Sequence, residues 1–69
     1  MKSLKAEELR ALSDEDLVRR ENEHRESLFK FRMRLATGQM SKMADIQATR
    51  RNLARILTEQ NRRRKAAQQ

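Results

Sequence analysis

Arginine is the residue type in this sequence whose chemistry is clearest. Its guanidinium group can donate two parallel hydrogen bonds to a phosphate and can stack on nucleobases, so arginine-rich surfaces suit folded RNA. The basic residues of the C-terminal part are therefore candidate RNA-binding residues. They are Lys30, Arg32, Arg34, Lys42, Arg50, Arg51, Arg55, Arg62, Arg63, Arg64 and Lys65. A solvated charged surface without a ligand is the alternative interpretation.

The charge is unevenly distributed along the 69 residues, whose net charge is +7. Residues 1–27 carry eight acidic and six basic side chains, a balance of −2. Residues 28–69 carry eleven basic and two acidic side chains, a balance of +9. A segment this basic repels itself unless an anionic partner neutralises it, and binding to phosphates releases counterions. The distribution therefore favours a polyanionic partner.

Catalytic, metal and cofactor sites have almost no support in the sequence. There is no cysteine and only one histidine, His24, which is too few for a metal site and lacks an evident nucleophile to activate. A phosphate-binding P-loop is excluded because Gly38 is the only glycine. Ser13 and Ser41 are better explained as helix caps. We therefore expect no enzyme, no metal, no cofactor and no small-molecule substrate.

The side chains used by common RNA-binding modules are also missing. The sequence has no tyrosine, no tryptophan and no GXXG loop, and Phe29 and Phe31 are expected to lie in the core rather than to stack on bases. Binding is therefore expected to follow the shape of the RNA and the positions of its phosphates.

Helices must position the basic side chains, because the sequence has no proline and one glycine. We expect an all-α fold in one domain, residues 1–69, with helices over roughly 3–11, 14–36 and 42–62 and a frayed tail over 63–69. Ser3 and Ser13 are the expected caps of the first two helices. Gly38 ends the second helix in the left-handed conformation. The short connection then makes the two long helices an antiparallel hairpin, preceded by a short helix.

One apolar stripe on each long helix forms the expected seam of the hairpin. The seam residues are Leu17, Leu28, Phe31 and Leu35 on the second helix and Met43, Ile46, Leu53 and Leu57 on the third. Residues 19–27 contain no apolar side chain, so this end of the hairpin should pack loosely. Leu4, Leu9 and Leu12 can fold over it.

Phe29, Met33 and Ala36 form a second apolar set on the second helix, about 100° or more away from the seam. Two interpretations remain open for this set. It packs inside the monomer, or it docks on a partner.

Arg51, Arg55 and Arg62 fall within one stripe of the third helix, opposite its apolar seam, when the helix is projected at about 100° per residue. Arg50 lies near the edge of the seam, where its stem can cover apolar surface. The backbone amides at the start of this helix can bind a phosphate or be satisfied by Asp45, and the sequence does not decide between the two.

No apolar run is long enough to span a bilayer, since the longest uncharged stretch covers residues 35–41. The N-terminal residues also lack the apolar core of a signal peptide. The expected location is the cytoplasm.

Four segments resemble, in order and spacing, the motifs of a known family. They are ELRALSDEDL at residues 8–17, SLFKFR at 27–32, ATGQM at 36–40 and TRRNLARILT at 49–58. Together they make the sequence similar to bacterial members of the universal large-subunit ribosomal protein family numbered twenty-nine. The sequence departs from the family over residues 19–27, where the family usually has leucines, and at Ser27 and Phe31.

The resemblance implies a helical hairpin with a short leading helix. It implies a structural role on the rRNA of the cytoplasmic large ribosomal subunit, near the mouth of the polypeptide exit tunnel. Neighbouring ribosomal proteins at the tunnel rim are the implied protein partners, and nascent-chain factors dock nearby. The motif positions carried over as rRNA contacts are Arg32, Gln39, Arg50, Arg51 and Arg55.

Two other functions are compatible with a basic helical chain. A coiled-coil-like homodimer is disfavoured because the gap over residues 19–27 interrupts the heptad pattern. A basic DNA-binding protein is disfavoured because no helix-turn-helix spacing is present. The favoured function is that of a structural rRNA-binding protein.

Overall fold

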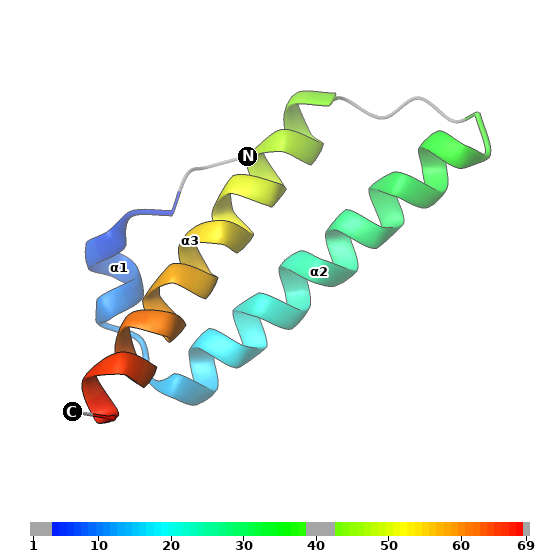
Figure 1. The fold of residues 1–69 in the computed structure, drawn as a ribbon. Coiled ribbons are helices and arrows are strands. Elements are labelled where there is room, and N and C mark those ends of the chain that lie inside the picture. The colour runs from blue at the N-terminus through cyan, green and yellow to red at the C-terminus, as the bar shows by residue number, and fades with distance from the viewer. Residues whose placement is uncertain (1–3, 39–42, 69) are drawn as a thin grey trace.

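The computed structural model describes residues 4–38 and 43–68, which form three helices (Figure 1). Helix α1 spans Ala6–Arg10, α2 spans Asp14–Ala36 and α3 spans Met43–Ala67. Helices α2 and α3 lie side by side in opposite directions, and α1 lies against α3. This arrangement confirms the expected all-α fold, and the described residues contain no strand.

Helix α2 begins and ends where the sequence predicts. The Ser13 hydroxyl accepts a hydrogen bond from the Asp16 backbone amide at 3.1 Å. Acidic side chains follow in the first turn, where they stabilise the positive end of the helix dipole. At the other end Gly38 has a φ of +81°, the left-handed conformation that favours glycine. The Thr37 hydroxyl donates to the Met33 and Arg34 carbonyls there.

Helix α3 is longer than predicted, because it continues through Ala67 instead of ending near Arg62. Two factors favour this last stretch of helix. Ala66 and Ala67 are strong helix formers, and Arg63 binds the segment at the end of α1. Residues 63–67 are therefore helical, whereas the sequence placed them in the tail.

Helix α1 is shorter than predicted, since it begins at Ala6 and ends at Arg10. Lys5 occupies its N-cap position, without a side-chain hydrogen bond to the helix. The expected caps Ser3 and Ser41 lie outside the described residues.

One cluster of buried side chains joins all three helices at the open end of the hairpin. Leu9 of α1, Leu17 of α2 and Ile56 of α3 are its buried members, and Leu4 and Leu12 pack against it. The first helix thus folds over this end, as expected.

A second cluster lies nearer the connection between α2 and α3. It contains Leu28, Ile46 and Leu53, with Phe31 packed against them. These four residues belong to the predicted seam, and their contacts confirm that part of it.

The predicted seam was wrong at three other positions. Leu35, Met43 and Leu57 are 43%, 57% and 37% exposed, whereas Ile56 is fully buried. Helix α1 packs against the flank of α3 and so extends the buried face of α3 toward Ile56. A seam drawn for two helices does not include this third contact.

Buried polar side chains on α3 have partners within the chain. The Thr49 hydroxyl donates to the Asp45 carbonyl at 2.8 Å. The Asn52 side-chain oxygen accepts a hydrogen bond from the Leu4 amide at 3.1 Å, which anchors the segment before α1. Buried polar groups are tolerated when they are bonded in this way.

The segment 19–27 of α2, which lacks apolar residues, uses polar contacts instead. Arg25 donates to Glu21 at 2.7 Å, and this bond, followed by one from Gln60 of α3, lowers the pKa of the Glu21 carboxyl. The half-buried His24 lies on the same segment, with Nδ1 at 2.8 Å from the Arg20 carbonyl. Polar contacts therefore take the place of apolar ones in this segment.

Candidate nucleic-acid interface

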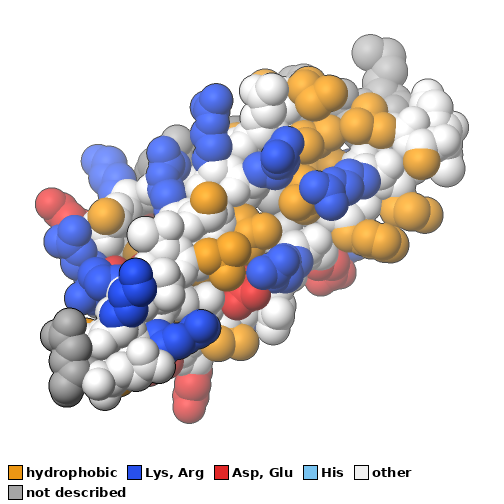
Figure 2. Space-filling model, viewed as in Figure 1, with side chains coloured by type: hydrophobic (Ala, Val, Ile, Leu, Met, Phe, Trp, Pro, Cys, Tyr) orange, Lys and Arg blue, Asp and Glu red, His pale blue; other side chains and the backbone are white. Residues whose placement is uncertain are grey.

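Three arginines lie on the outer face of α3. Arg51, Arg55 and Arg62 are exposed, whereas Ile46 and Leu53 of the same helix are buried against α2. A helix that buries one face against its neighbours holds the opposite side chains toward solvent. Figure 2 shows Lys and Arg side chains spread over one face of the molecule, with apolar side chains between and beside them.

Three further basic candidates on α3 are also exposed. They are Arg50, Arg64 and Lys65. Arg50 and Arg51 line one shallow hollow with Gln47 and Ala54, so their side chains lie close together on the surface of α3. Guanidinium groups grouped in this way can contact neighbouring phosphates of one backbone.

The basic candidates on α2 are exposed, and two of them have partners on the same helix. Lys30 lies 3.1 Å from the Glu26 carboxylate, and the Arg34 guanidinium lies 5.9 Å from the centre of the Phe31 ring. Arg32 is exposed. Gln39 and Lys42 lie outside the described residues.

Arg63 differs from the other candidates because its guanidinium is engaged inside the molecule. It donates to the carbonyls of Leu9, Arg10 and Leu12 at 3.1, 3.2 and 2.7 Å. It also bonds to the carboxylates of Asp14 at 2.7 Å and Glu59 at 2.9 Å.

The bonds to the two carboxylates, that to Asp14 first, raise the pKa of Arg63. The bonds to the carbonyls give the end of α1 and the segment after it an additional donor. The half-buried side chain therefore acts as a clamp between α1, the start of α2 and the end of α3.

Glu59 is the acidic partner in this clamp and is buried. Arg62 donates to both of its oxygens, with Nε to Oε1 at 3.1 Å and Nη2 to Oε2 at 2.7 Å. These bonds and the bond from Arg63 lower the pKa of Glu59 to about 2, with Arg62 the larger influence. The same contact raises the pKa of Arg62. Glu59 is therefore ionised at neutral pH and balances part of the arginine charge.

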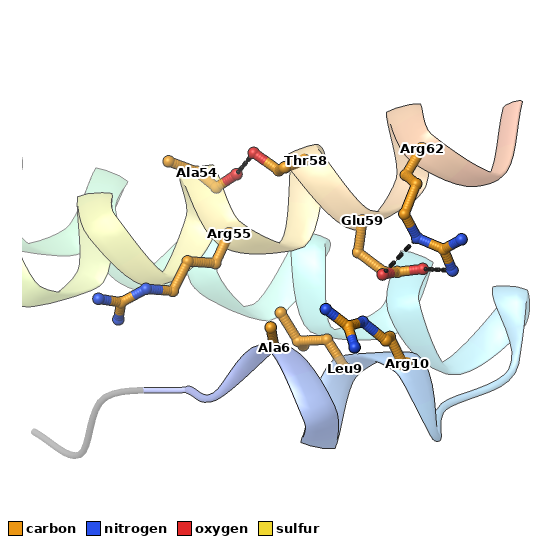
Figure 3. A pocket seen from close by; sticks show the side chains of 8 residues that line it. All are labelled: Ala6, Leu9, Arg10, Ala54, Arg55, Thr58, Glu59 and Arg62. Carbon is orange, nitrogen blue, oxygen red and sulfur yellow. Dashed lines mark hydrogen bonds and ion pairs between the residues drawn. The ribbon is translucent and has the colours of Figure 1, made fainter. Parts of the chain in front are cut away.

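A hollow of about 310 Å³ lies between α1 and α3 (Figure 3). Its lining includes Arg55 and Arg62 of α3 and a residue that sequence reasoning missed, Arg10 of α1. Arg10 follows the buried Leu9 in the chain. The sequence signal for Arg10 was its neighbour Leu9. A residue next to a buried contact of α1 lies at the edge of the interface with α3.

The apolar set on α2 faces solvent. Phe29 is 63% exposed, Met33 is 50% exposed and Ala36 is also exposed. Of the two interpretations left open by the sequence, packing inside the monomer is therefore wrong. The second interpretation, a docking surface, remains.

Neither a metal site nor a membrane span is found in the parts of the chain that the structure describes. Residues 4–38 and 43–68 contain no group of three or more His, Cys, Asp or Glu side chains placed to hold a metal ion. None of the described helices is long and apolar enough to cross a membrane.

Fold and surface together define a class of protein: a small, strongly basic helical hairpin with arginines on the outer face of its last helix. The sequence narrows this class to one family. Residues 7–63 match the family described as ribosomal L29 protein, and the chain belongs to this family. It is thus a structural, non-enzymatic protein of the large ribosomal subunit.

Individual relatives agree with this assignment. The chain is 47% identical over 64 residues to the large ribosomal subunit protein uL29 of Rubrobacter xylanophilus, covering 93% of this chain and 96% of that protein. It is 44% identical to the uL29 proteins of Pelotomaculum thermopropionicum, over 80% of this chain and 82% of that one, and of Streptococcus pneumoniae, over 78% and 79%. No solved structure gives a significant match.

Proposed function

We propose that the chain binds large-subunit rRNA through the outer face of α3, by shape and phosphate contacts. The observation that carries this proposal is the group of exposed guanidinium groups of Arg51, Arg55 and Arg62, held on the side of α3 away from its α2 contact. Further proposed contacts are Lys30, Arg32, Arg34, Gln39, Lys42, Arg50, Arg64 and Lys65. Phosphate contacts of this kind position a protein on RNA without reading the base sequence.

Arg63 has an indirect part in this proposal. Its donors bind Asp14, Glu59 and carbonyls at the end of α1, so it fixes the position of α1 beside α3. The contribution of Arg63 to RNA binding is therefore to hold the shape of the basic surface.

The proposed position is at the mouth of the polypeptide exit tunnel in the cytoplasmic large subunit, with a ribosomal protein of the tunnel rim on the Phe29 surface. We use this name for Phe29, Met33 and Ala36, which are exposed on α2. Contiguous exposed apolar side chains are typical of protein interaction sites. Nascent-chain factors would then dock nearby.

The rRNA contact is tested by rebinding the full chain to large subunits depleted of it. The double variant Arg51→Gln/Arg55→Gln should bind less tightly, and the slope of log affinity against log salt should become shallower by about 1.4–1.8, because each lost phosphate contact removes about 0.7–0.9. The matched control is Arg19→Gln/Arg20→Gln on α2, which carries the same charge change. An unchanged salt slope in the double variant would contradict the proposal.

The position is tested by cross-linking and mass spectrometry of intact large subunits. Cross-links should join α2 residues beside the Phe29 surface to a protein at the tunnel mouth. Cross-links only to proteins on the subunit-interface side would overturn the proposed position. Recovery of the chain in free cytosol, away from large-subunit fractions of a sucrose gradient, would overturn the assignment to rRNA.

A further inference from the structure

We propose that the hollow between α1 and α3 binds one unpaired nucleotide of the rRNA, with its phosphate on the guanidinium groups of Arg10 and Arg62 and its base against the apolar part of the lining (Figure 3). The inference rests on the proposed rRNA binding and adds to it a defined site and a class of ligand.

Arginines from two helices line the hollow. Arg10 comes from α1, and Arg55 and Arg62 come from α3, with the Arg55 guanidinium turned away from the other two (Figure 3). Arg55 uses one nitrogen for a bond to Asn52 at 3.2 Å, and Arg62 uses Nε and Nη2 for Glu59. A guanidinium has five N–H donors, so both keep donors for an anion. Arg10 and Arg62 are exposed, so their guanidinium groups are accessible to a phosphate at the rim.

The carboxylate in the lining does not prevent anion binding. Glu59 is buried, and both of its oxygens accept hydrogen bonds from Arg62, with a further bond from Arg63. Its negative charge is thus paired within the clamp. The charged side chains that remain exposed around the hollow are the arginines, which are positive. A phosphate at the rim therefore meets a net positive field.

The apolar part of the lining points to more than a bare phosphate. Ala6, Leu9 and Ala54 are lining residues together with the arginines, and Ala6 lies beside the buried Leu9 on α1 (Figure 3). A lining of apolar and charged side chains is typical of sites for ligands that have an apolar body and a few polar groups. A nucleotide has this chemistry, with an apolar base face and an anionic phosphate.

The nucleotide should be unpaired. The hollow is bounded by two helices, and a base can enter it only when it has left its own helical stack. Sequence-specific RNA recognition mostly uses such splayed bases, and a guanidinium plane can stack on them in place of an aromatic ring. The described residues place no aromatic side chain in this hollow, so arginine stacking is the available mode.

The test fills the hollow without changing its charge. Ala6→Leu adds an apolar side chain at an exposed helical position, where leucine is a good helix former. The matched control is Ala66→Leu, the same substitution at an exposed helical position outside the lining. A second pair is Arg10→Gln in the hollow and Arg20→Gln on α2, which lies outside it. Circular dichroism melts establish that each full-length variant is folded.

Each variant is rebound to large subunits depleted of the protein, and the rRNA is probed with reagents that modify unpaired bases. We expect the wild-type chain to protect one unpaired base beside α1. Arg10→Gln should bind about tenfold less tightly, the effect of about one lost charged hydrogen bond. Ala6→Leu should also bind less tightly, because its side chain occupies the space of the base, and both variants should leave that base reactive. Both controls should keep the affinity and the protection of the wild type.

Three results would overturn the inference. If the wild type binds rRNA but Ala6→Leu and Arg10→Gln have the same affinity and footprint, the hollow is not a nucleotide site although the proposed function stands. Cross-links from the hollow only to a ribosomal protein would assign it to a protein partner instead. If the wild type does not bind rRNA, the proposed function fails and the inference fails with it.

Discussion

The guanidinium of Arg63 joins the end of α1, the start of α2 and the last turns of α3. Arg63→Gln should remove most of these bonds, including the donors that Arg63 supplies to the carbonyls of Leu9 and Leu12. We expect a loss of about 2 kcal/mol in the free energy of unfolding, and a fall in Tm of roughly 10 °C for a chain of this size. Thermal unfolding followed by circular dichroism measures the change.

Arg64→Gln is the matched control for Arg63, because Arg64 is the next residue and is exposed. Its effect should stay within about 0.5 kcal/mol, as for most surface substitutions. Equal melting temperatures for the two variants would show that the bonds of Arg63 contribute nothing to stability.

Glu59 gives the stability of the fold a dependence on acidic pH. Its pKa is lowered from 4.5 to about 2 by the bonds from Arg62 and Arg63, so folding favours the ionised carboxylate. The stabilisation is therefore complete above the unfolded pKa, near pH 4.5, and is lost as the pH falls toward 2. Glu59→Gln should be less stable than the wild type at pH 7, and the difference should vanish near pH 2.

Thermal melts of the wild type and Glu59→Gln at pH 7, 5, 3 and 2 measure this convergence. Glu26→Gln is the control, since Glu26 is an exposed acid of α2. A constant difference between Glu59→Gln and the wild type from pH 7 to pH 2 would show that ionisation of Glu59 does not stabilise the fold.

At the scale of the elements, Gly38 ends α2 with a φ of +81°. A Cβ at this position would meet no atom within 4 Å, so the cost of a substitution comes from the backbone conformation alone. Gly38→Ala should lower the free energy of unfolding by about 1 kcal/mol, the cost of a left-handed conformation for a residue with a Cβ. Gly38→Asn should cost less, because asparagine tolerates this conformation.

Urea unfolding of the two Gly38 variants provides the measurement. The expected order of stability is glycine, then asparagine, then alanine. If alanine were as stable as glycine, the left-handed cap would not be what ends α2.

The helix ends and part of the seam could be predicted because their causes are local. Ser13 and Gly38 act on the backbone within a few residues of themselves, and Leu28 and Leu53 follow the helical period. The burial of Ile56 in place of Leu57 depends on where α1 packs. The helical period of α3 gives no information on the position of α1.

The same distinction between local causes and tertiary packing applies to the arginines of the candidate site. Arg51 and Arg55 could be placed on the outer face from their spacing, and the structure leaves them exposed. Arg63 has the same residue type in the same basic run, yet its partners on α1 and α2 are 49 or more positions away. Its clamp, and the hollow beside Arg10, result from tertiary packing and could not be derived from the order of charges.

At the scale of the whole molecule, the fold is long and thin, with extents of 48 × 18 × 16 Å. Its buried apolar side chains form two small clusters instead of one core. Chains of this size rarely gain more than about 3–5 kcal/mol from a single hydrophobic core. We therefore expect the free chain to be marginally stable and to gain stability when it binds rRNA.

Binding to rRNA should raise the free energy of unfolding of the chain. A ligand that binds only the folded state adds about 2.7 kcal/mol when its free concentration is 100 times its Kd. Hydrogen exchange measured by mass spectrometry, on the free chain and on the chain in reconstituted large subunits, reports this change by segment. Protection should rise most in α1, because this five-residue helix is held mainly by Leu9, Arg63 and the bond from Leu4 to Asn52.

Phe29→Ser separates rRNA binding from protein docking in the same experiment. Phe29 is exposed and lies outside both buried clusters, so this variant should fold as the wild type does. If rRNA orders α1, protection of α1 in reconstituted subunits should survive Phe29→Ser and should fall in Arg51→Gln/Arg55→Gln. The opposite pattern, in which the loss of Phe29 releases α1 and the loss of the two arginines does not, would place the ordering contact on a protein neighbour.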